Sequence, residues 1–174
     1  MENEIGLDLE TLDFEHFSTA LKSYAEEVRA LYRRRLIEDD KFASGKLIQD
    51  MTTSIKFLGT QVTVYLNLVD YWKYVEGGRE PGKWPPRDKI REWIKIKPVI
   101  PEPDTEGRLP TPEQLTFLIQ RKIGEEGIEA GNQLRDTVQS VNSWWIPKLQ
   151  SALQKDFDTY TIKVFQAAER MIKI

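Results

Sequence analysis

The residue types that most often perform catalysis are scarce in this chain of 174 residues. Cysteine is absent, so neither a disulfide framework nor a thiolate metal site can form, and the one histidine is His16. A histidine-rich metal site and a triad of serine, histidine and aspartate are therefore nearly excluded within one chain. The carboxylate pairs Asp39–Asp40 and Glu125–Glu126 could act as acid and base, but both fall at expected helix ends, where acidic side chains are usually only solvated. The sequence predicts no catalytic residue, metal or cofactor, and a small cellular hydrolase is a poor alternative.

The glycine-rich stretch from Gly77 to Lys83 has the composition of a phosphate-binding P-loop but not its order. In a P-loop, the lysine is followed by a serine or threonine whose hydroxyl binds Mg²⁺. Trp84 follows the lysine in this chain. We therefore predict no nucleotide site in this stretch.

Basic residues are concentrated between Arg79 and Lys97, where seven lysines and arginines stand against three acidic residues, with Trp84 and Trp93 among them. This pattern could grip a nucleic-acid backbone, because cations neutralise phosphates and indoles stack on bases. The whole chain, however, has a net charge of −3 and offers no second patch of this kind. We therefore favour an acidic protein partner and keep a nucleic-acid-binding or DNA-packaging accessory protein as the alternative.

Glycine and proline restrict the backbone in residues 77–86. Glycine adopts positive φ at little cost, whereas proline holds φ at about −65° and lacks an N–H donor. The two glycines at the start of this segment are expected to end a helix, and Pro81-Gly82 suits the central positions of a type II turn. A helix is expected next, with Ile90, Trp93 and Ile94 on one face. The pattern predicts a shaped loop that presents a short amphipathic helix; a plain surface linker is the alternative.

Two long amphipathic helices are predicted near the ends of the chain. From Phe14 to Asp39 or Asp40, apolar residues recur at steps of four and three, which is the period of one helical face. The same rhythm continues from Ser143, the expected N-cap, to the C-terminus, with Pro147 in the first turn. Residues 128–142, before this helix, are ambiguous.

Between the long helices the period changes to two, which is typical of strands. Apolar and polar residues alternate over 47–57 and again over 62–68, and the short turn between these runs contains glycine. The two runs predict an antiparallel hairpin. Since an isolated hairpin is marginally stable, it must pack on the long helices or join strands of a neighbouring chain.

Shorter segments complete the expected fold. A helix rich in aromatic residues is expected over 70–76, and an extended, acidic excursion over 98–110. A further helix begins at Thr111, the expected N-cap, with proline at the first helical position and glutamine at the third. The predicted buried face of that helix consists of Leu115, Leu118, Ile119 and Ile123.

Residues 1–13 form an acidic N-terminal arm with five acidic residues and no basic residue. The arm lacks the apolar segment of a signal peptide, and no run approaches the ~18 apolar residues that a membrane span needs. We expect an α+β fold without a membrane partner. In it, residues 14–174 form a single domain in which the long helices pack on the hairpin, and residues 77–110 form a projecting loop region.

One extended pattern resembles a known family. The run Tyr71-x-x-Tyr74-Val75-Glu76-x-Gly78-Arg79-x-Pro81-Gly82-Lys83-x-Pro85-Pro86, followed by Ile90-x-x-Trp93-Ile94, is similar to the neck or tail-completion proteins of tailed bacteriophages. After a gap, the family tends to continue with a helix similar to Leu115–Ile123 and a closing Glu126-Gly127. Where the family often has a proline–aromatic pair, this chain has Ile128–Asn132. The resemblance covers about residues 65–130.

The resemblance implies a structural virion protein without catalysis, because members of this family join the portal-bearing head to the tail. It implies a homo-oligomeric ring of six or twelve subunits at the head–tail junction. The implied partners are portal or adaptor proteins and tail proteins, and genomic DNA passes through the lumen without sequence-specific binding. The implied location is the virion, after synthesis in the cytoplasm of the host bacterium. The assembly loop assigned in this way consists of Gly78, Arg79, Pro81, Gly82, Lys83, Trp84, Pro85 and Pro86, together with Trp93.

Overall fold

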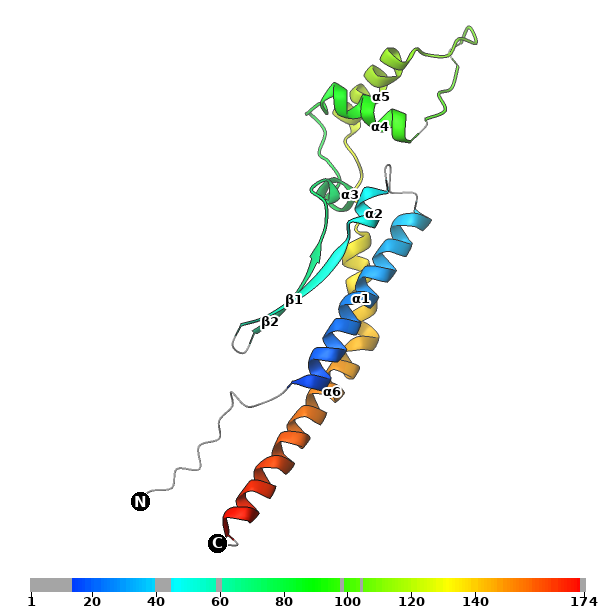
Figure 1. The fold of residues 1–174 in the computed structure, drawn as a ribbon. Coiled ribbons are helices and arrows are strands. Elements are labelled where there is room, and N and C mark those ends of the chain that lie inside the picture. Colours follow the sequence, from blue (N-terminus) through cyan, green and yellow to red (C-terminus); the bar gives the residue numbers. More distant parts are fainter. Residues whose placement is uncertain (1–13, 40–44, 59–60, 98, 104, 173–174) are drawn as a thin grey trace. The chain divides into compact units, whose positions relative to one another are not determined.

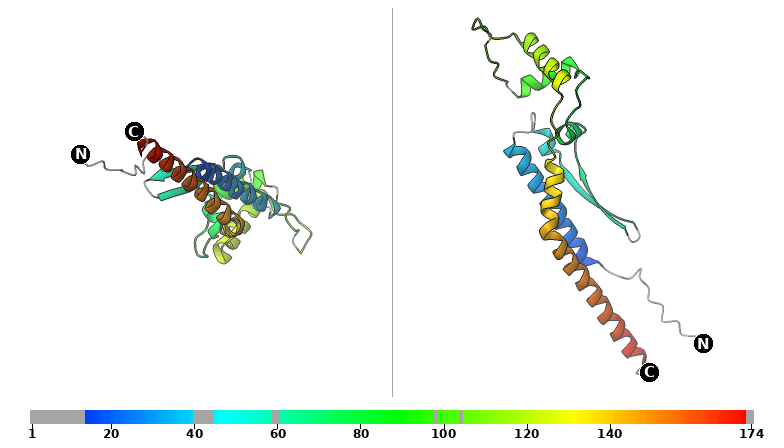
Figure 2. Two further views of the ribbon diagram at one scale, coloured as in Figure 1. Left: turned by 90° about the horizontal axis from the view of Figure 1, so that it is seen from below. Right: turned by 180° about the vertical axis from the view of Figure 1, so that it is seen from behind.

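The computed structural model describes residues 14–39, 45–58, 61–97, 99–103 and 105–172 (Figures 1 and 2). The acidic arm predicted for residues 1–13 lies outside this part of the chain. The prediction of an α+β fold with two long helices and an antiparallel hairpin is confirmed. The elements are α1 (Glu15–Glu38), α2 (Lys46–Gln49), β1 (Thr52–Leu58), β2 (Gln61–Asn67), α3 (Trp72–Gly77), α4 (Arg87–Ile96), α5 (Pro112–Glu126) and α6 (Gln133–Ile172).

Internal contacts group the chain into two compact units. The first unit comprises the chain up to Val28, the segment Thr53–Tyr65 and the chain from Val138 onward. The second unit comprises Arg29–Thr52 and Leu66–Thr137. The residues of the predicted assembly loop therefore all belong to the second unit.

In the first unit, the first half of α1 packs antiparallel to α6. The Tyr24 hydroxyl donates a hydrogen bond to Asn142 Oδ1 at 2.8 Å, and the rings of Tyr24 and Trp145 meet edge to face with centroids 6.2 Å apart. Nearer the start of α1, the ring of Phe14 meets that of Phe157 at 6.3 Å. The buried apolar residues along this contact are Leu21, Ala25, Val28 and Val141.

Asp156 of α6 caps the N-terminus of α1. The first amides of a helix lack an acceptor within the helix, so an outside carboxylate can satisfy them. Asp156 accepts hydrogen bonds from the backbone N–H groups of His16 at 3.0 Å and Phe17 at 2.8 Å, and its Oδ1 lies 2.7 Å from His16 Nδ1. Burial by itself raises the pKa of Asp156, but the hydrogen bonds from Phe17 and His16 outweigh burial and hold this pKa below its ordinary value.

The hairpin follows the predicted order but begins later than predicted. Asn67 Nδ2 donates to Thr52 Oγ1 at 3.3 Å, which places the last residue of β2 beside the first residue of β1. The Thr53 hydroxyl donates to Glu26 Oε1 at 2.7 Å and so ties the hairpin to α1. The prediction that the strand begins at Leu47 is wrong, because α2 precedes β1.

The one-turn helix α2 replaces the predicted strand start because both Leu47 and Ile48 are buried. In a strand, neighbouring side chains point to opposite faces, whereas one helical turn directs both toward the same core. The core of the second unit is formed by Tyr32, Leu36, Leu47, Ile48 and Met51, and the backbone N–H of Leu47 donates to the Tyr71 hydroxyl at 2.8 Å.

The last helix begins ten residues earlier than its predicted cap, at Gln133, so Ser143 and Pro147 lie in the interior of α6. The prediction that Ser143 is the N-cap is wrong; its hydroxyl donates instead to the carbonyl of Ser140 at 2.7 Å. A backbone N–H in the first turn of α6 has its acceptor outside the helix: Leu134 donates to Glu76 Oε2 at 2.9 Å.

Glu76 also faces Tyr32, whose side chain is fully buried. Burial raises the pKa of the Tyr32 phenol, and the Glu76 carboxylate raises it further. The Tyr32 hydroxyl and the Glu76 carboxylate therefore interact within the core, and this interaction adds to the effect of burial on the Tyr32 pKa.

Candidate assembly site

The predicted assembly loop begins where α3 ends. Gly78 follows α3 with φ of 67°, and Arg79 pairs with Ile128 in an antiparallel bridge. Each of these two residues donates its backbone N–H to the carbonyl of the other at 2.8 Å. A Cβ atom at Gly78 would lie 2.2 Å from the Ile128 carbonyl oxygen, so the bridge requires glycine there.

A second glycine meets the loop from the opposite strand of the bridge. Gly127, which follows α5, has φ of 78°, and a Cβ there would lie 2.3 Å from the Arg79 carbonyl oxygen. Gly78 and Gly127 thus allow the loop and the segment after α5 to approach backbone to backbone.

The turn at Pro81-Gly82 has the expected backbone geometry. Gly82 has φ of 102°, and its N–H donates to the carbonyl of Gly124 in α5 at 2.7 Å. No atom lies within 4 Å of a Cβ built at Gly82, so glycine is favoured there by conformation and not by lack of space.

Trp84 lies against α5 at a glycine. A Cβ at Gly124 would be 2.5 Å from Trp84 Cδ1 and 2.6 Å from Nε1, so the indole occupies the space of the missing side chain. The indole also contacts Phe117, with ring centroids 5.7 Å apart. Trp84 is nonetheless 46% exposed. Trp84 is thus partly packed on α5 and partly exposed.

The contact with the loop changes which face of α5 is buried. Thr116, Gln120 and Gly124 are buried, Leu115, Ile119 and Ile123 of the predicted face are half-buried, and Leu118 is exposed, so the prediction of the buried face is only partly correct. Leu118 is 41% exposed. The physical reason is that this face receives polar backbone: Gln120 Nε2 donates to the Pro85 carbonyl at 2.7 Å within the interior. The Thr116 hydroxyl is satisfied by the Pro112 carbonyl of its own helix.

The remaining loop residues brace the loop internally and lead into α4. Arg79 donates from a guanidinium nitrogen to the Lys83 carbonyl at 3.0 Å, and its guanidinium lies 6.0 Å from the centroid of the Tyr74 ring. The Pro86 carbonyl accepts the first amide hydrogen bonds of α4, the helix that carries Trp93. This helix packs against α5 (Figure 1).

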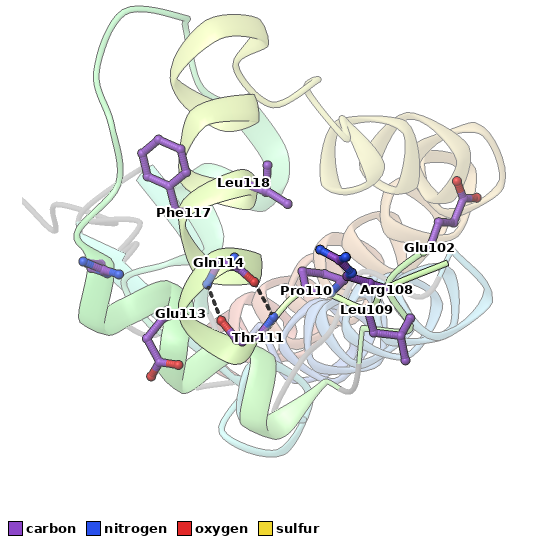
Figure 3. Close-up of a pocket in the computed structure, with 10 residues that line it drawn as sticks. Glu102, Arg108, Leu109, Pro110, Thr111, Glu113, Gln114, Phe117 and Leu118 are labelled. Atoms are coloured by element: carbon purple, nitrogen blue, oxygen red, sulfur yellow. Dashed lines mark hydrogen bonds between the residues drawn. The ribbon is translucent and has the colours of Figure 1, made fainter. Parts of the chain in front are cut away.

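An open groove of about 830 Å³ lies beside α5 (Figure 3). The capping box at its floor is formed as predicted: Thr111 Oγ1 accepts from the Gln114 N–H, and Gln114 Oε1 accepts from the Thr111 N–H. Figure 3 shows Phe117 and Leu118 projecting from α5, and Leu109 on the segment leading into it. The groove is lined by Arg87, Glu102, Arg108, Leu109, Pro110, Thr111, Glu113, Gln114, Phe117 and Leu118.

Several charged side chains near the loop form local ion pairs on the surface. In α4, Lys89 pairs with Glu92 at 3.2 Å and Arg91 with Asp88 at 3.4 Å. The carboxylates considered for acid–base chemistry are also paired: Glu125 with Arg121 and Glu126 with Lys122, both at 3.9 Å and exposed. Asp39 accepts a hydrogen bond from Gln133, and Asp40 lies outside the described residues. Among the residues that the structure describes, no three His, Cys, Asp or Glu side chains form a group that could hold a metal ion.

The structure thus brings the loop residues Gly78 to Pro86 together with one face of α5 and the segment that follows it. Sequence reasoning missed Gln120, Gly124 and Gly127 as the residues that hold the loop. The available signal was the spacing of Thr116, Gln120 and Gly124, which are four residues apart and so share one helical face.

Comparison of the chain with protein-family models, with curated proteins and with solved structures finds no match. Among the described helices, none has a stretch both long enough and apolar enough to cross a membrane.

Proposed function

We propose that this chain is a structural protein of the virion that forms a homo-oligomeric ring at the head–tail junction of a tailed bacteriophage. The ring, of six or twelve subunits, links the portal or adaptor side to the tail around the DNA channel. Its role is assembly and not catalysis, and the DNA passes through the lumen without sequence-specific binding. The assembly loop supplies part of the contact with a neighbouring subunit or ring.

The observation that carries this proposal is the joining of two distant parts of the family-like pattern. The run that ends at Pro86 and the helix that ends at Glu126-Gly127 are far apart in sequence, yet they meet through the Arg79–Ile128 bridge and the Gln120–Pro85 hydrogen bond. Two short patterns that resemble one family by chance have no reason to form one folded unit. Their joining therefore supports a common origin for both.

The exposed apolar side chains around the loop favour a protein partner. Trp84 and Phe117 contact each other and remain exposed, and Leu118 and Leu109 line the adjoining groove. Exposed apolar residues that gather in one area are typical of interaction sites, and aromatic anchors dominate the energetics of many interfaces. The loop that holds Trp84 is braced by hydrogen bonds, so little conformational entropy would be lost when a partner binds.

The nucleic-acid alternative relies on the basic residues between Arg79 and Lys97. Two of these residues, Lys89 and Arg91, form ion pairs within α4, and Arg79 is engaged by a carbonyl and a ring. A titration of duplex DNA against salt separates the two functions. A steep, linear loss of log affinity with log salt would support the nucleic-acid alternative, because it measures the release of counterions from neutralised phosphates.

Copy number in phage particles tests the proposal directly. Quantitative mass spectrometry of purified virions is expected to give six or twelve copies, and negative-stain images of virions that lack the protein are expected to show unjoined heads and tails. A single copy in each virion would refute the ring. Presence of the protein only in infected cells, and not in particles, would refute the structural role.

A further inference from the structure

The last turns of α6 extend beyond the start of α1, within the first compact unit (Figures 1 and 2). Asp156 of α6 caps the first amides of α1, so the residues of α6 that follow it, 157–172, continue past the point where α1 begins. At about 1.5 Å for each residue, this part of α6 is roughly 24 Å long. α1 packs on α6 before this part and does not cover it.

An apolar face continues along this uncovered part of α6. Its residues, which we call the terminal stripe, are Phe157, Tyr160, Val164, Phe165 and Ala168. Their spacing places them on one side of the helix. Phe157 is 44% exposed and Phe165 is 67% exposed. Because an apolar face of a helix is normally packed, the terminal stripe is a surface suited to a further apolar segment.

The chain that precedes α1 begins next to this stripe. The ring of Phe14, the residue before α1, lies against that of Phe157, with centroids 6.3 Å apart. The acidic N-terminal arm, residues 1–13, joins the chain at this point. Thirteen residues span about 20 Å as a helix and up to roughly 45 Å when extended, so the arm is long enough to follow the stripe in either form.

The arm also contains the apolar residues that such a contact requires. Between its five acidic residues it carries four large aliphatic ones, which are Ile5, Leu7, Leu9 and Leu12. An arm that stayed in solvent would gain nothing from these side chains, whereas each one that is buried stabilises a docked state.

We propose that residues 1–13 dock along the terminal stripe of their own copy, with the aliphatic side chains of the arm on the stripe. Because α1 runs antiparallel to α6, a chain that continues the line of α1 backward runs beside residues 157–172. The arm is covalently joined at the edge of the stripe, so its effective concentration there exceeds that of a separate partner. The inference goes beyond the proposed ring and does not depend on it.

Charge favours the same occupant. Lys148, Lys155 and Lys163 are seven and eight residues apart, which places them on one side of α6. Two of them, Lys148 and Lys155, line an open groove together with His16 and Glu15 at the start of α1. The arm has five acidic residues and no basic residue. Attraction between the lysines and these carboxylates orients the arm, whereas a second copy of α6 would offer the same row of lysines.

Disulfide formation tests the docking in a chain that has no cysteine of its own. Thr11→Cys places a thiol in the arm, and Thr161→Cys places one four residues from both Phe157 and Phe165. Thr159→Cys, on another side of the helix, is the matched control. Both threonines are exposed, and each donates its hydroxyl to the carbonyl four residues before it. Under mild oxidation of the purified protein, we expect Thr11→Cys to form a disulfide within one chain several times faster with Thr161→Cys than with Thr159→Cys.

The other outcomes of this experiment overturn the inference. Equal rates for the two pairs would mean that the arm has no preference for the stripe. Disulfide-linked dimers between Thr11→Cys and Thr161→Cys would mean that the arm of another copy occupies the stripe. Dimers of the Thr161→Cys variant alone would mean that a second copy of α6 occupies it.

Hydrogen exchange provides a second measurement that needs no thiol. Removal of residues 2–12 is expected to speed the exchange of amides in residues 157–168, because docking suppresses local opening, and to leave residues 141–152 unchanged. Leu9→Asp should act in the same direction, since it places a charge in an apolar contact. Thr11→Asp adds the same charge at a polar position and should have little effect. Unchanged exchange in the truncated chain, or equal effects of the two aspartate variants, would overturn the inference.

Discussion

Gly124→Ala is expected to destabilise the protein, although alanine is the better helix former. Within a helix, alanine is favoured over glycine by about 1 kcal/mol. The new Cβ would lie 2.5 Å from Trp84 Cδ1, so the indole must move away from its packed position on α5. Trp84 is 46% exposed, so roughly 100 Å² of its side chain is buried there, which is worth about 2.5 kcal/mol. The lost burial of Trp84 exceeds the gain in helix propensity by about 1.5 kcal/mol, which corresponds to a fall of roughly 3–6 °C in melting temperature for a chain of this size.

Urea and thermal unfolding followed by circular dichroism measure this difference, and two variants isolate its cause. Gly77→Ala is the matched control, because Gly77 ends α3 and no atom lies within 4 Å of a Cβ built there. That control is expected to unfold at the same or a higher urea concentration than the parent. In a Trp84→Ala background the clash is absent, so Gly124→Ala should then be neutral or stabilising by up to about 1 kcal/mol.

The reasoning fails if Gly124→Ala raises the unfolding midpoint as the control does. It also fails if the effects of Gly124→Ala and Trp84→Ala simply add, because additivity means that the two residues are not in contact. Either result would mean that α5 does not hold the indole, and the proposed role of the loop would lose its rigid support.

Three further substitutions test the capping, the core and the turn. Asp156→Asn is expected to lower the free energy of unfolding by about 1.5 kcal/mol at pH 7, as measured in urea. Because the folded pKa of Asp156 is lowered, its stabilising contribution is present above the unfolded pKa of about 4 and is lost as pH falls through the folded pKa. The difference in stability between variant and parent should therefore shrink in acid. Tyr32→Phe removes the interaction of a buried hydroxyl with the Glu76 carboxylate, so it should lower the free energy of unfolding by about 1 kcal/mol in urea unfolding; an unchanged midpoint would show that the two groups do not interact. Gly82→Val forces a β-branched residue to φ of 102° and should reduce the joining of heads to tails more than it lowers the melting temperature; normal yields of joined particles would contradict the role of this turn.

Periodicity predicted the elements whose burial is regular over many residues. Two positions of the predicted apolar stripe in α1, Leu21 and Val28, are buried, and the alternation in β1 and β2 matches their pairing. The capping box at Thr111 was also predictable, because both of its hydrogen bonds join residues three apart in sequence. In each of these elements, the determining interactions are local or repeat with the period of the element.

The errors occur where a distant residue decides the local structure. Glu76 fixes the start of α6 by accepting a hydrogen bond from the backbone N–H of Leu134, which lies 58 residues later in the sequence. The start of α1 was predicted correctly, but the carboxylate that caps it comes from Asp156, 140 residues away from His16, and was not predicted. A sequence search for Ser, Thr, Asp or Asn just before a helix cannot find such caps, because the acceptor arrives only when the helices pack.

The buried face of α5 was predicted only in part, for a related reason that bears on the proposed function. A hydrophobicity pattern assumes that a helix buries its apolar residues, but α5 buries Thr116, Gln120 and Gly124 because it receives a loop whose backbone is polar. Leu118 and Phe117 remain on the surface, and Phe117 contacts Trp84. A chain selected only for its own stability would gain by burying those side chains. Their exposure, next to a loop held by close contacts at three glycines, agrees with the proposal that a partner covers them in a ring.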